Sequence, residues 1–173
     1  MKGIVIYKGK YGATAQYAEW IAEALYLPLY DLDKQFIDQL ETRDTIIIGS
    51  PVYVGKLLVK NWLFKNARLL KNKKILLFIV CGAAGDKIKQ EQVIKQNLPG
   101  WLAKSGEIYF LPGKVDMKKL SWWDRFLIRM AAMMQKDPTK RQAMRRGYDA
   151  VKREHINDLI KNVLHYANTE KVI

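Results

Sequence analysis

Three glycine-bearing stretches hold the residue types that could bind an anionic or aromatic ligand. The first, KGKYGAT at residues 8–14, follows a run of β-formers and leads directly into an amphipathic helix. A helix N-terminus presents unpaired backbone N–H groups and the positive end of the helix dipole, and glycines let the backbone wrap closely around a ligand. The stretch therefore predicts a phosphate cradle. A flexible turn with Thr14 as an ordinary helix cap is the alternative, because neither a Walker loop nor a G-x-G-x-x-G spacing is present.

Two further stretches also follow apolar runs. GSPVYVGK at residues 49–56 places Tyr53 between a proline and a glycine, and CGAAGDK at residues 81–87 carries two glycines. Tyr53 is a candidate to pack on a planar ligand, with capping of a sheet end as the alternative. Gly82 and Gly85 permit a ligand to approach the backbone closely. The three stretches could line one site if the fold brings them together.

The elements that must position these stretches alternate between strand and helix. Apolar or β-rich runs predict strands at residues 2–7, 27–31, 45–49, 74–81 and 108–112. Helical periodicity predicts helices at residues 14–25, 57–70, 87–105 and 152–166, with a weak helical turn at 36–41. Three of the strands are apolar along their whole length, as in a parallel sheet covered on both faces. We therefore expect a doubly wound α/β fold with a five-stranded parallel sheet in the order 2-1-3-4-5. This order places the three stretches beyond the carboxyl ends of neighbouring strands.

The chain is strongly basic. Its 173 residues include 30 Lys or Arg and 17 Asp or Glu, for a net charge of +13. Residues 56–74 hold seven basic residues and no acidic one, and residues 114–153 hold twelve basic and four acidic residues. Such a surface attracts anionic partners, an anionic membrane surface among them, unless it is merely a soluble basic face. No nucleic-acid motif accompanies the charge, so a nucleic-acid partner is not expected.

Length and cysteine content favour one domain in a reducing compartment. The single cysteine, Cys81, excludes a disulfide within the chain and favours the cytoplasm. The N-terminal apolar run is too short for a signal peptide, and the longest apolar run, residues 75–84, is too short to span a bilayer. No metal site is expected. His155 and His165 both lie in the last expected helix, where structural or exposed positions are expected, so catalytic residues stay unassigned.

An extra segment, at about residues 114–151, separates the fifth strand from the last helix. Ser121 is expected to cap a helix, with Asp124 as its partner in a variant of the capping box. Seven apolar residues share one side of this helix: Trp122, Trp123, Phe126, Leu127, Met130, Met133 and Met134. This stripe either packs against the protein's own sheet or contacts a membrane or a large apolar ligand. The contact residues expected in the second case are Trp122, Trp123, Arg125, Phe126, Arg129 and Met130.

The three stretches together resemble the loops of the flavodoxin family. That family's phosphate loop has the form Ser/Thr-x-Thr-Gly-x-Thr. Gly12 and Thr14 match it, while Gly9 and Tyr11 stand where the family has hydroxyl residues. The second stretch resembles the family's Gly-Ser-Pro-Thr-Tyr loop, whose aromatic residue packs on the flavin. The resemblance implies a single flavodoxin-like domain over residues 1–173 and FMN as the cofactor. The FMN-binding residues implied are Lys8, Gly9, Lys10, Tyr11, Gly12, Ala13 and Thr14, then Ser50, Pro51, Val52, Tyr53, Val54 and Gly55, and finally Cys81, Gly82, Ala83, Ala84 and Gly85.

The extra segment resembles a narrower group within that family. Residues 122–126, Trp-Trp-Asp-Arg-Phe, look like the Trp-Tyr-Asp-Arg-Phe insertion of the flavodoxin-like protoporphyrinogen IX dehydrogenases. Membership of that group implies oxidation of protoporphyrinogen IX to protoporphyrin IX, with menaquinone or ubiquinone as the acceptor. It also implies a peripheral position at the inner face of the cell membrane.

Two other functions remain open from the sequence. One is an electron carrier of the flavodoxin type, or a flavodoxin-domain protein with another redox role, because the flavin loops are shared by many relatives. The other is a flavin-free basic module that binds membranes or anions, because the net charge is +13.

Overall fold

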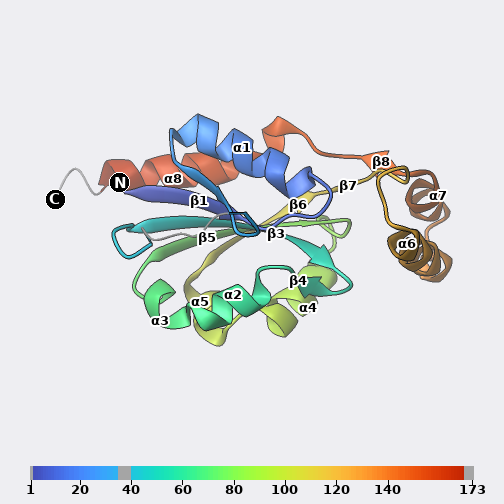
Figure 1. Cartoon of the computed structure of the whole chain (residues 1–173), viewed down its shortest axis with the longest axis horizontal. Coiled ribbons are helices and arrows are strands. Elements are labelled where there is room, and N and C mark those ends of the chain that lie inside the picture. The colour runs from blue at the N-terminus through green and yellow to red at the C-terminus, as the bar shows by residue number, and fades with distance from the viewer. Residues whose placement is uncertain (1, 35–39, 170–173) are drawn as a thin grey trace.

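A five-stranded parallel sheet forms the centre of the molecule (Figure 1). The computed structural model describes residues 2–34 and 40–169. The strand order β2-β1-β3-β5-β6 confirms the expected 2-1-3-4-5 topology. The strands are β1 (Gly3–Tyr7), β2 (Leu29–Asp31), β3 (Thr45–Tyr53), β5 (Lys74–Cys81) and β6 (Glu107–Pro112).

Helices cover both faces of this sheet, which explains why its central strands are apolar throughout. In Figure 1, α1 (Ala13–Leu25) and α8 (Asn157–Thr169) lie on one face. The other face carries α2 (Lys60–Lys65), α3 (Ala67–Leu70), α4 (Lys87–Asn97) and α5 (Gly100–Ser105). A short 3-10 turn, η1 (Arg153–Ile156), leads into α8.

Alternate residues of each central strand supply two separate cores. Val5, Ile47 and Leu76 pack with α1 and α8 on one face. Ile6, Ile48 and Leu77 pack on the opposite face. The alternation follows from the two-residue period of a strand, and it fixes the register of each pair.

Two of the expected helices are divided. The helix expected at 57–70 breaks at Asn66, whose side-chain amide donates to the Trp62 carbonyl at 2.8 Å. The helix expected at 87–105 breaks before Pro99, because Leu98 is extended, as the residue before a proline tends to be. Most of the helical turn expected at 36–41 lies outside the described residues.

The second stretch is a β-hairpin, although the sequence predicts a loop there. Strand β3 continues to Tyr53 and turns back through Val54 and Gly55 into β4 (Lys56–Leu57). Both turn residues have positive φ, 48° for Val54 and 75° for Gly55, as a type I′ turn requires. The cause is the pair of β-formers Val52 and Tyr53, followed by a two-residue turn that ends in glycine.

The inserted segment forms a helical hairpin on a two-stranded stem. Strands β7 (Lys114–Val115) and β8 (Tyr148–Asp149) pair antiparallel, and α6 (Trp122–Met134) and α7 (Pro138–Arg146) lie between them in the chain. In Figure 1 the two helices project at one end of the sheet. We call residues 116–147 the helical hairpin. Both helices are capped by side chains, α6 by Ser121 and α7 by Asp137.

Candidate functional site

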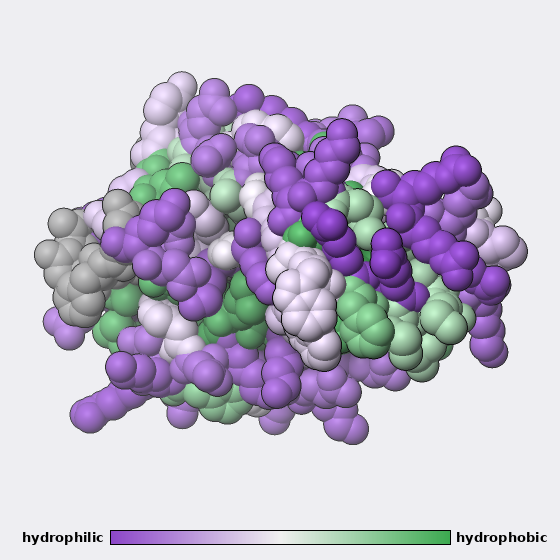
Figure 2. Space-filling model, turned by 45° about the vertical axis from the view of Figure 1, so that its right-hand side comes forward, coloured by the Kyte–Doolittle hydropathy of each residue, from purple (hydrophilic) through white to green (hydrophobic). Residues whose placement is uncertain are grey.

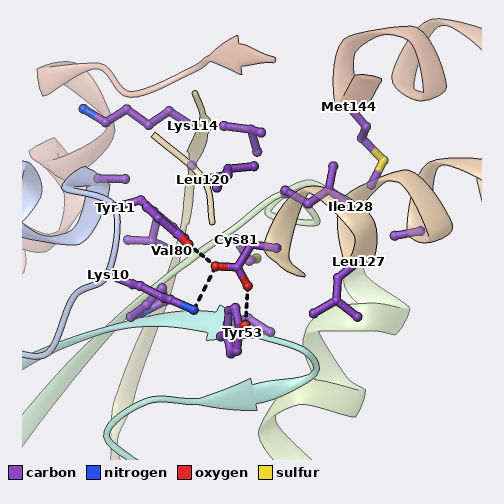
Figure 3. A pocket seen from close by; sticks show the side chains of 18 of the residues that line it. Lys10, Tyr11, Tyr53, Val80, Cys81, Lys114, Leu120, Leu127, Ile128 and Met144 are labelled. Carbon is purple, nitrogen blue, oxygen red and sulfur yellow. Dashed lines mark hydrogen bonds and ion pairs between the residues drawn. The ribbon is translucent and has the colours of Figure 1, made fainter. Parts of the chain in front are cut away.

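A cavity of about 400 Å³ lies beyond the carboxyl ends of β1, β3 and β5 (Figure 3). All three glycine-bearing stretches line it, so the fold brings together what the sequence separates by up to about seventy residues. The expected binding residues that line the cavity are Lys10, Tyr11, Ala13, Thr14, Pro51, Val52, Tyr53, Val54, Cys81 and Gly82. Its volume falls within the range of about 300–1,000 Å³ that is typical of small-molecule sites.

The first stretch forms the N-terminus of α1. Gly12 precedes the helix with φ 85°, a left-handed conformation that favours glycine, and no side chain caps the first turn. This finding rules out the alternative in which Thr14 serves as the helix cap. The first turn also contains no acidic residue. The loop therefore leaves backbone N–H groups and the positive helix end facing a site that suits an anion.

The second stretch places Tyr53 and the strained Val54 at the cavity. Val54 is a β-branched residue with positive φ, a conformation that costs free energy and is seen most often at functional sites. Gly49 has a separate, structural role, because a Cβ atom there would lie 2.1 Å from the Phe78 ring. Ser50 is also structural: its side chain is fully buried, and its hydroxyl accepts the Val59 N–H at 3.3 Å.

The third stretch meets the stem of the helical hairpin. A Cβ atom at Gly82 would lie 3.0 Å from the Tyr148 hydroxyl, so a side chain at Gly82 would crowd that tyrosine. Burial raises the pKa of the Cys81 thiol. Burial, followed by the nearby Cys81, also raises the pKa of Tyr148.

Asp124 joins the helical hairpin to two of the loops. Its carboxylate accepts hydrogen bonds from the hydroxyls of Tyr11 and Tyr53, and it forms an ion pair with the Lys10 ammonium at 2.9 Å (dashed lines in Figure 3). The Lys10 ammonium also lies 3.8 Å from the centre of the Tyr53 ring, a cation–π contact. With only 3% of its surface exposed, Asp124 is the one charged side chain among the buried residues of the described chain.

The two charges of this cluster stabilise each other. Burial alone would raise the pKa of the Asp124 carboxyl, but the hydrogen bonds from Tyr11, Tyr53 and Lys10 outweigh burial and hold that pKa well below its usual range. Burial alone would likewise lower the pKa of Lys10, but its bonds to Tyr53 and Asp124 raise it above the usual value. Both groups are therefore charged across the neutral range.

The sequence prediction for Asp124 is corrected in one respect. Ser121 does cap α6, because its hydroxyl accepts the Asp124 N–H at 3.1 Å, as one half of a capping box requires. The Asp124 carboxylate, however, turns into the cavity instead of back to the Ser121 backbone. Its partners lie 113 and 71 residues away in the chain, so no local pattern could reveal them.

Several expected binding residues lie near the cavity but outside its lining. The Lys8 ammonium pairs with Asp33 at 2.6 Å instead of facing the first loop. The remaining residues in this group are Gly9, Gly12, Ser50, Gly55, Ala83, Ala84 and Gly85. Their side chains, where present, do not contribute to the lining, and for the glycines only backbone contacts are possible.

The apolar stripe of α6 does not pack on the sheet. Trp122 is 77% exposed, Trp123 49% and Met134 82%, and Phe126, Met130 and Met133 are exposed as well. In Figure 2, pale and green side chains gather along the lower edge of the forward-facing projection, below dark purple ones. The structure therefore excludes the reading of this stripe as core. Only Leu127 of the expected stripe turns inward, where it lines the cavity.

Arg125 and Arg129, the two arginines among the expected contact residues, have different surroundings. The Arg125 guanidinium donates to the carbonyls of Leu120 at 3.1 Å and Lys118 at 3.3 Å, so it fastens the preceding loop to α6. Arg129 is exposed.

His155 has the structural role expected of it, since its Nδ1 lies 3.0 Å from the Tyr17 hydroxyl.

Sequence reasoning missed the residues of the helical hairpin and its stem that close the cavity. Leu120, Ile128, Ala131 and Met144 form its apolar side, with Lys114, Val115 and Tyr148 from the stem. The sequence did carry one signal of this wall, because Ile128 and Ala131 lie beside Leu127 on a second apolar face of α6. That face could be recognised as a cavity wall only after the hairpin was placed.

The sequence pattern of the flavodoxin domain family matches residues 4–142, which is most of the chain. The chain belongs to the flavodoxin domain family. The cavity of this flavodoxin-domain chain thus lies at the edge formed by the three loops that carry the family resemblance.

Other comparisons give more distant likenesses. An uncharacterised protein of Methanocaldococcus jannaschii is 32% identical over 83 residues, which cover 47% of this chain and 55% of that relative. The match thus spans little more than half the relative's length. A flavodoxin from the domain Archaea is similar at 20% identity with a TM-score of 0.47, covering 68% of this chain and 87% of that one. A flavoprotein from Lactobacillus acidophilus, solved in complex with FMN, is similar at 18% identity with a TM-score of 0.46. The match covers 64% of this chain and 91% of that one.

Among residues 2–34 and 40–169, no helix has both the length and the apolar content needed to cross a bilayer.

Proposed function

We propose that this flavodoxin-domain chain binds FMN in the cavity between its three loops and acts as a flavodoxin-type redox protein. The observation that carries the proposal is the convergence of the three loops on one cavity of about 400 Å³ at the carboxyl edge of the sheet. FMN, when bound, supplies the transfer of hydride or single electrons. The chain supplies the binding contacts, the orientation and the exclusion of water.

The donor set of the first loop suits a phosphate group. The α1 N-terminus offers backbone N–H groups, and the Thr14 side chain, which is almost fully buried, lines the cavity. Lys10 adds a positive charge on the same side. One point opposes a simple phosphate loop, because the Lys10 ammonium and the Tyr11 hydroxyl already bind the Asp124 carboxylate. The backbone donors and Thr14 therefore carry the phosphate contact in this proposal.

The apolar part of the cavity suits a planar ring. Tyr53, Val80 and Leu127 provide aromatic and aliphatic surface from three different elements. Tyr53 is held in one orientation, because its hydroxyl bonds to Asp124 and its ring lies against the Lys10 ammonium. A fixed aromatic side chain loses little entropy when a ring packs on it.

The wall that α6 forms at the cavity favours an enzyme over a free electron carrier. Residues of α6, among them Leu127 and Ile128, wall the side of the cavity that faces away from the sheet. A carrier that exchanges electrons at an exposed edge of its flavin needs no such wall. A walled cavity excludes water and can hold an organic substrate.

Protoporphyrinogen IX as the substrate, with a membrane quinone as the acceptor, is the narrower form of the proposal. It rests on the resemblance of residues 122–126 and on the chemistry of the exposed stripe. Trp122, Trp123 and the methionines of α6 form an apolar surface beside the exposed Arg129. Aromatic, methionine and basic side chains together suit the interface of an anionic membrane, where a quinone is dissolved. A cytoplasmic protein held at the inner face of the membrane fits this arrangement.

Titration of the flavin-free protein with FMN and with riboflavin tests the cofactor. We expect FMN to bind at least about tenfold more tightly, because only FMN has the phosphate. Thr14→Val, which removes the hydroxyl but keeps the size, is expected to weaken FMN binding by about three- to tenfold and to leave riboflavin binding unchanged. Failure to take up either flavin would contradict the proposal and favour a flavin-free binding module.

A second experiment separates an enzyme from a carrier. In the FMN-loaded protein, anaerobic mixing with protoporphyrinogen IX is expected to bleach the flavin absorption, and a menaquinone analogue is expected to restore it. No bleaching in a fully loaded protein would contradict the substrate. Two well-separated one-electron steps during reductive titration would favour the carrier.

A further inference from the structure

A second cavity lies beside the first, and most of its wall comes from the inserted segment. It has a volume of about 450 Å³ and follows the β7–β8 stem. Tyr11, Lys114, Val115 and Tyr148 line both cavities. The two spaces therefore adjoin.

The second cavity carries an excess of positive charge. Four cationic side chains line it: Lys114, Lys118, Lys119 and Arg146. Within the described part of the chain, none of these four forms an ion pair. The two carboxylates of the wall bond to backbone groups instead, Asp116 to the Lys118 N–H at 3.0 Å and Asp149 to the Val151 N–H at 2.9 Å. Two positive charges are thus left over, and they favour an anionic ligand.

Specific contacts hold the walls of this cavity in place. Arg125 fastens the loop at residues 118–120 to α6 through two backbone carbonyls. On the opposite wall, Gly147 has φ 89°, and a Cβ atom there would lie 2.6 Å from the Val115 carbonyl oxygen. Only glycine allows this close approach of the Arg146–Gly147 turn to β7. The cationic side chains therefore extend from a defined backbone.

We propose that the second cavity binds a carboxylate of the substrate whose redox-active ring lies in the first cavity. This inference rests on the proposed function, because it assumes that the first cavity holds the flavin and the reacting ring. The two cavities suit the two parts of such a substrate. Apolar Leu127, Ile128 and Met144 line the first cavity and suit a ring, whereas lysines and an arginine line the second and suit a carboxylate. Lys and Arg donate charge-assisted hydrogen bonds to carboxylates. The substrate class is an apolar ring system with at least one carboxylate side chain.

The phosphate of FMN is the other possible source of an anion, and the topology argues against it. The phosphate donors of the first loop sit at the α1 N-terminus, whereas the second cavity takes only Tyr11 from that loop. Its cations belong to the inserted segment. Comparing FMN with riboflavin in the cavity variants separates the two sources, because only FMN carries the phosphate.

The probe is a matched pair of anthraquinones, one with a carboxylate substituent and one with a neutral carboxamide at the same position. Affinity is measured by calorimetry on the flavin-free and the FMN-loaded protein, and reoxidation of the reduced flavin is followed anaerobically. Two double variants remove cavity charge, Lys118→Gln with Lys119→Gln, and Lys114→Gln with Arg146→Gln. The control, Lys136→Gln with Lys140→Gln, removes the same charge from the hairpin outside both cavities.

We expect the wild-type protein to bind the carboxylate about three- to tenfold more tightly than the carboxamide. Each cavity variant is expected to reduce that preference to less than about twofold, while the control keeps it. The carboxamide affinity is expected to stay unchanged in the variant of Lys118 and Lys119, because these two residues line only the second cavity. No preference in the wild type, or a preference that survives both cavity variants, overturns the inference. Cavity variants that weaken FMN but not riboflavin also overturn it, because the cavity would then serve the cofactor's phosphate. If the protein takes up no FMN and the flavin-free form still prefers the carboxylate, the proposed function fails and the anion site stands.

Discussion

Asp124 is a buried carboxylate surrounded by donors from two loops that lie far away in the sequence. Such a group stabilises a fold only while its partners are present, because an unpaired buried charge is costly. The Lys10 ammonium and the two tyrosine hydroxyls compensate for its burial. This one residue therefore connects α6 to the first glycine-bearing stretch and to Tyr53.

Asp124→Asn tests this role. The change keeps the size of the side chain but leaves Lys10 without a counter-charge, so we expect the free energy of unfolding at pH 7 to fall by about 1–3 kcal/mol. Because the folded state lowers the pKa of Asp124, its contribution is present above the unfolded value of about 4 and is lost as pH falls through the lower folded value. The difference between wild type and variant should therefore shrink below about pH 4.

Urea denaturation at several pH values measures that difference. Asp158→Asn is the control, because Asp158 is an exposed aspartate and its pair with Lys161 spans 3.9 Å. We expect the control to change stability by no more than about 0.5 kcal/mol. Equal stability of wild type and Asp124→Asn at pH 7 would show that the contacts of the Asp124 carboxylate contribute nothing to the free energy of unfolding.

Val54 makes a second prediction at the scale of one residue. Its φ of 48° is unfavourable for a β-branched side chain, and Asn is the residue that type I′ turns prefer at this position. We expect Val54→Asn to stabilise the protein by about 1 kcal/mol, measured as a higher midpoint of urea denaturation. Val54→Ala, which shortens the side chain but keeps a residue unsuited to positive φ, should give a smaller gain. A destabilised Val54→Asn protein would show that Val54 contacts outweigh the backbone strain.

At the scale of elements, α6 presents two different faces. Asp124, Leu127 and Ile128 line the cavity, whereas Trp122 and Trp123 point to solvent. The aromatic rings also contact one another: the Trp123 ring is stacked on the Phe126 ring, with 5.6 Å between the two ring centres. A single helix thus closes the site and exposes an apolar surface, which would couple the site to any membrane that the helix contacts.

Replacing both Trp122 and Trp123 with Ala separates these two roles. Since both rings are half-exposed or more, we expect the free energy of unfolding to change by no more than about 1 kcal/mol. Binding to vesicles with anionic lipids, measured by sedimentation, should weaken by about tenfold or more, because two rings no longer enter the interface. FMN binding should be unchanged.

The matched control changes Tyr26 and Phe64 to Ala, two aromatic residues exposed elsewhere on the surface. We expect this variant to bind vesicles as the wild type does. If both double variants lose the same amount of binding, the helical hairpin has no special role at a membrane. Binding that is equal for neutral and anionic vesicles would argue against the contribution of the basic residues.

At the scale of the whole molecule, the helical hairpin is an addition to a complete α/β core. Of the described residues, none between 113 and 150 belongs to either core cluster. The stem brings Val115 and Tyr148 directly opposite each other. A two-residue Asn-Gly turn can therefore join these residues in place of the whole hairpin, because it closes a β-hairpin of that register.

Replacement of residues 116–147 by Asn-Gly is expected to leave a folded α/β protein. We expect the circular dichroism to retain the helices and strands of the core, with a loss of stability of about 1–3 kcal/mol from the missing Asp124 cluster. Vesicle binding and the preference for a carboxylate should both disappear. An unfolded product would show that the hairpin is part of the folding unit and not an addition to it.

The sequence by itself determined the five main strands, most of the helices between them and the positions of the three glycine-bearing stretches, but not β4, the β7–β8 stem or α7. The elements it determined depend on local signals: apolar runs for buried strands, glycines for tight backbone, and Ser121 as a helix cap. The strand order, which the structure confirms, was expected from the architecture that alternating strands and helices adopt. The same local signals indicated an amphipathic helix at residues 121–134, which α6 confirms. Local signals also gave the break at Pro99, although the sequence prediction passed over it.

Only the tertiary structure decided which side chains of the inserted segment line the cavity and which are exposed. An apolar stripe has the same period whether it is buried or exposed, so the sequence could not choose between core and surface for Trp122 and Trp123. The partners of Asp124 and the two adjoining cavities depend on contacts between residues far apart in the chain. Such contacts form only when the sheet fixes the distances between its loops, and no local pattern encodes them.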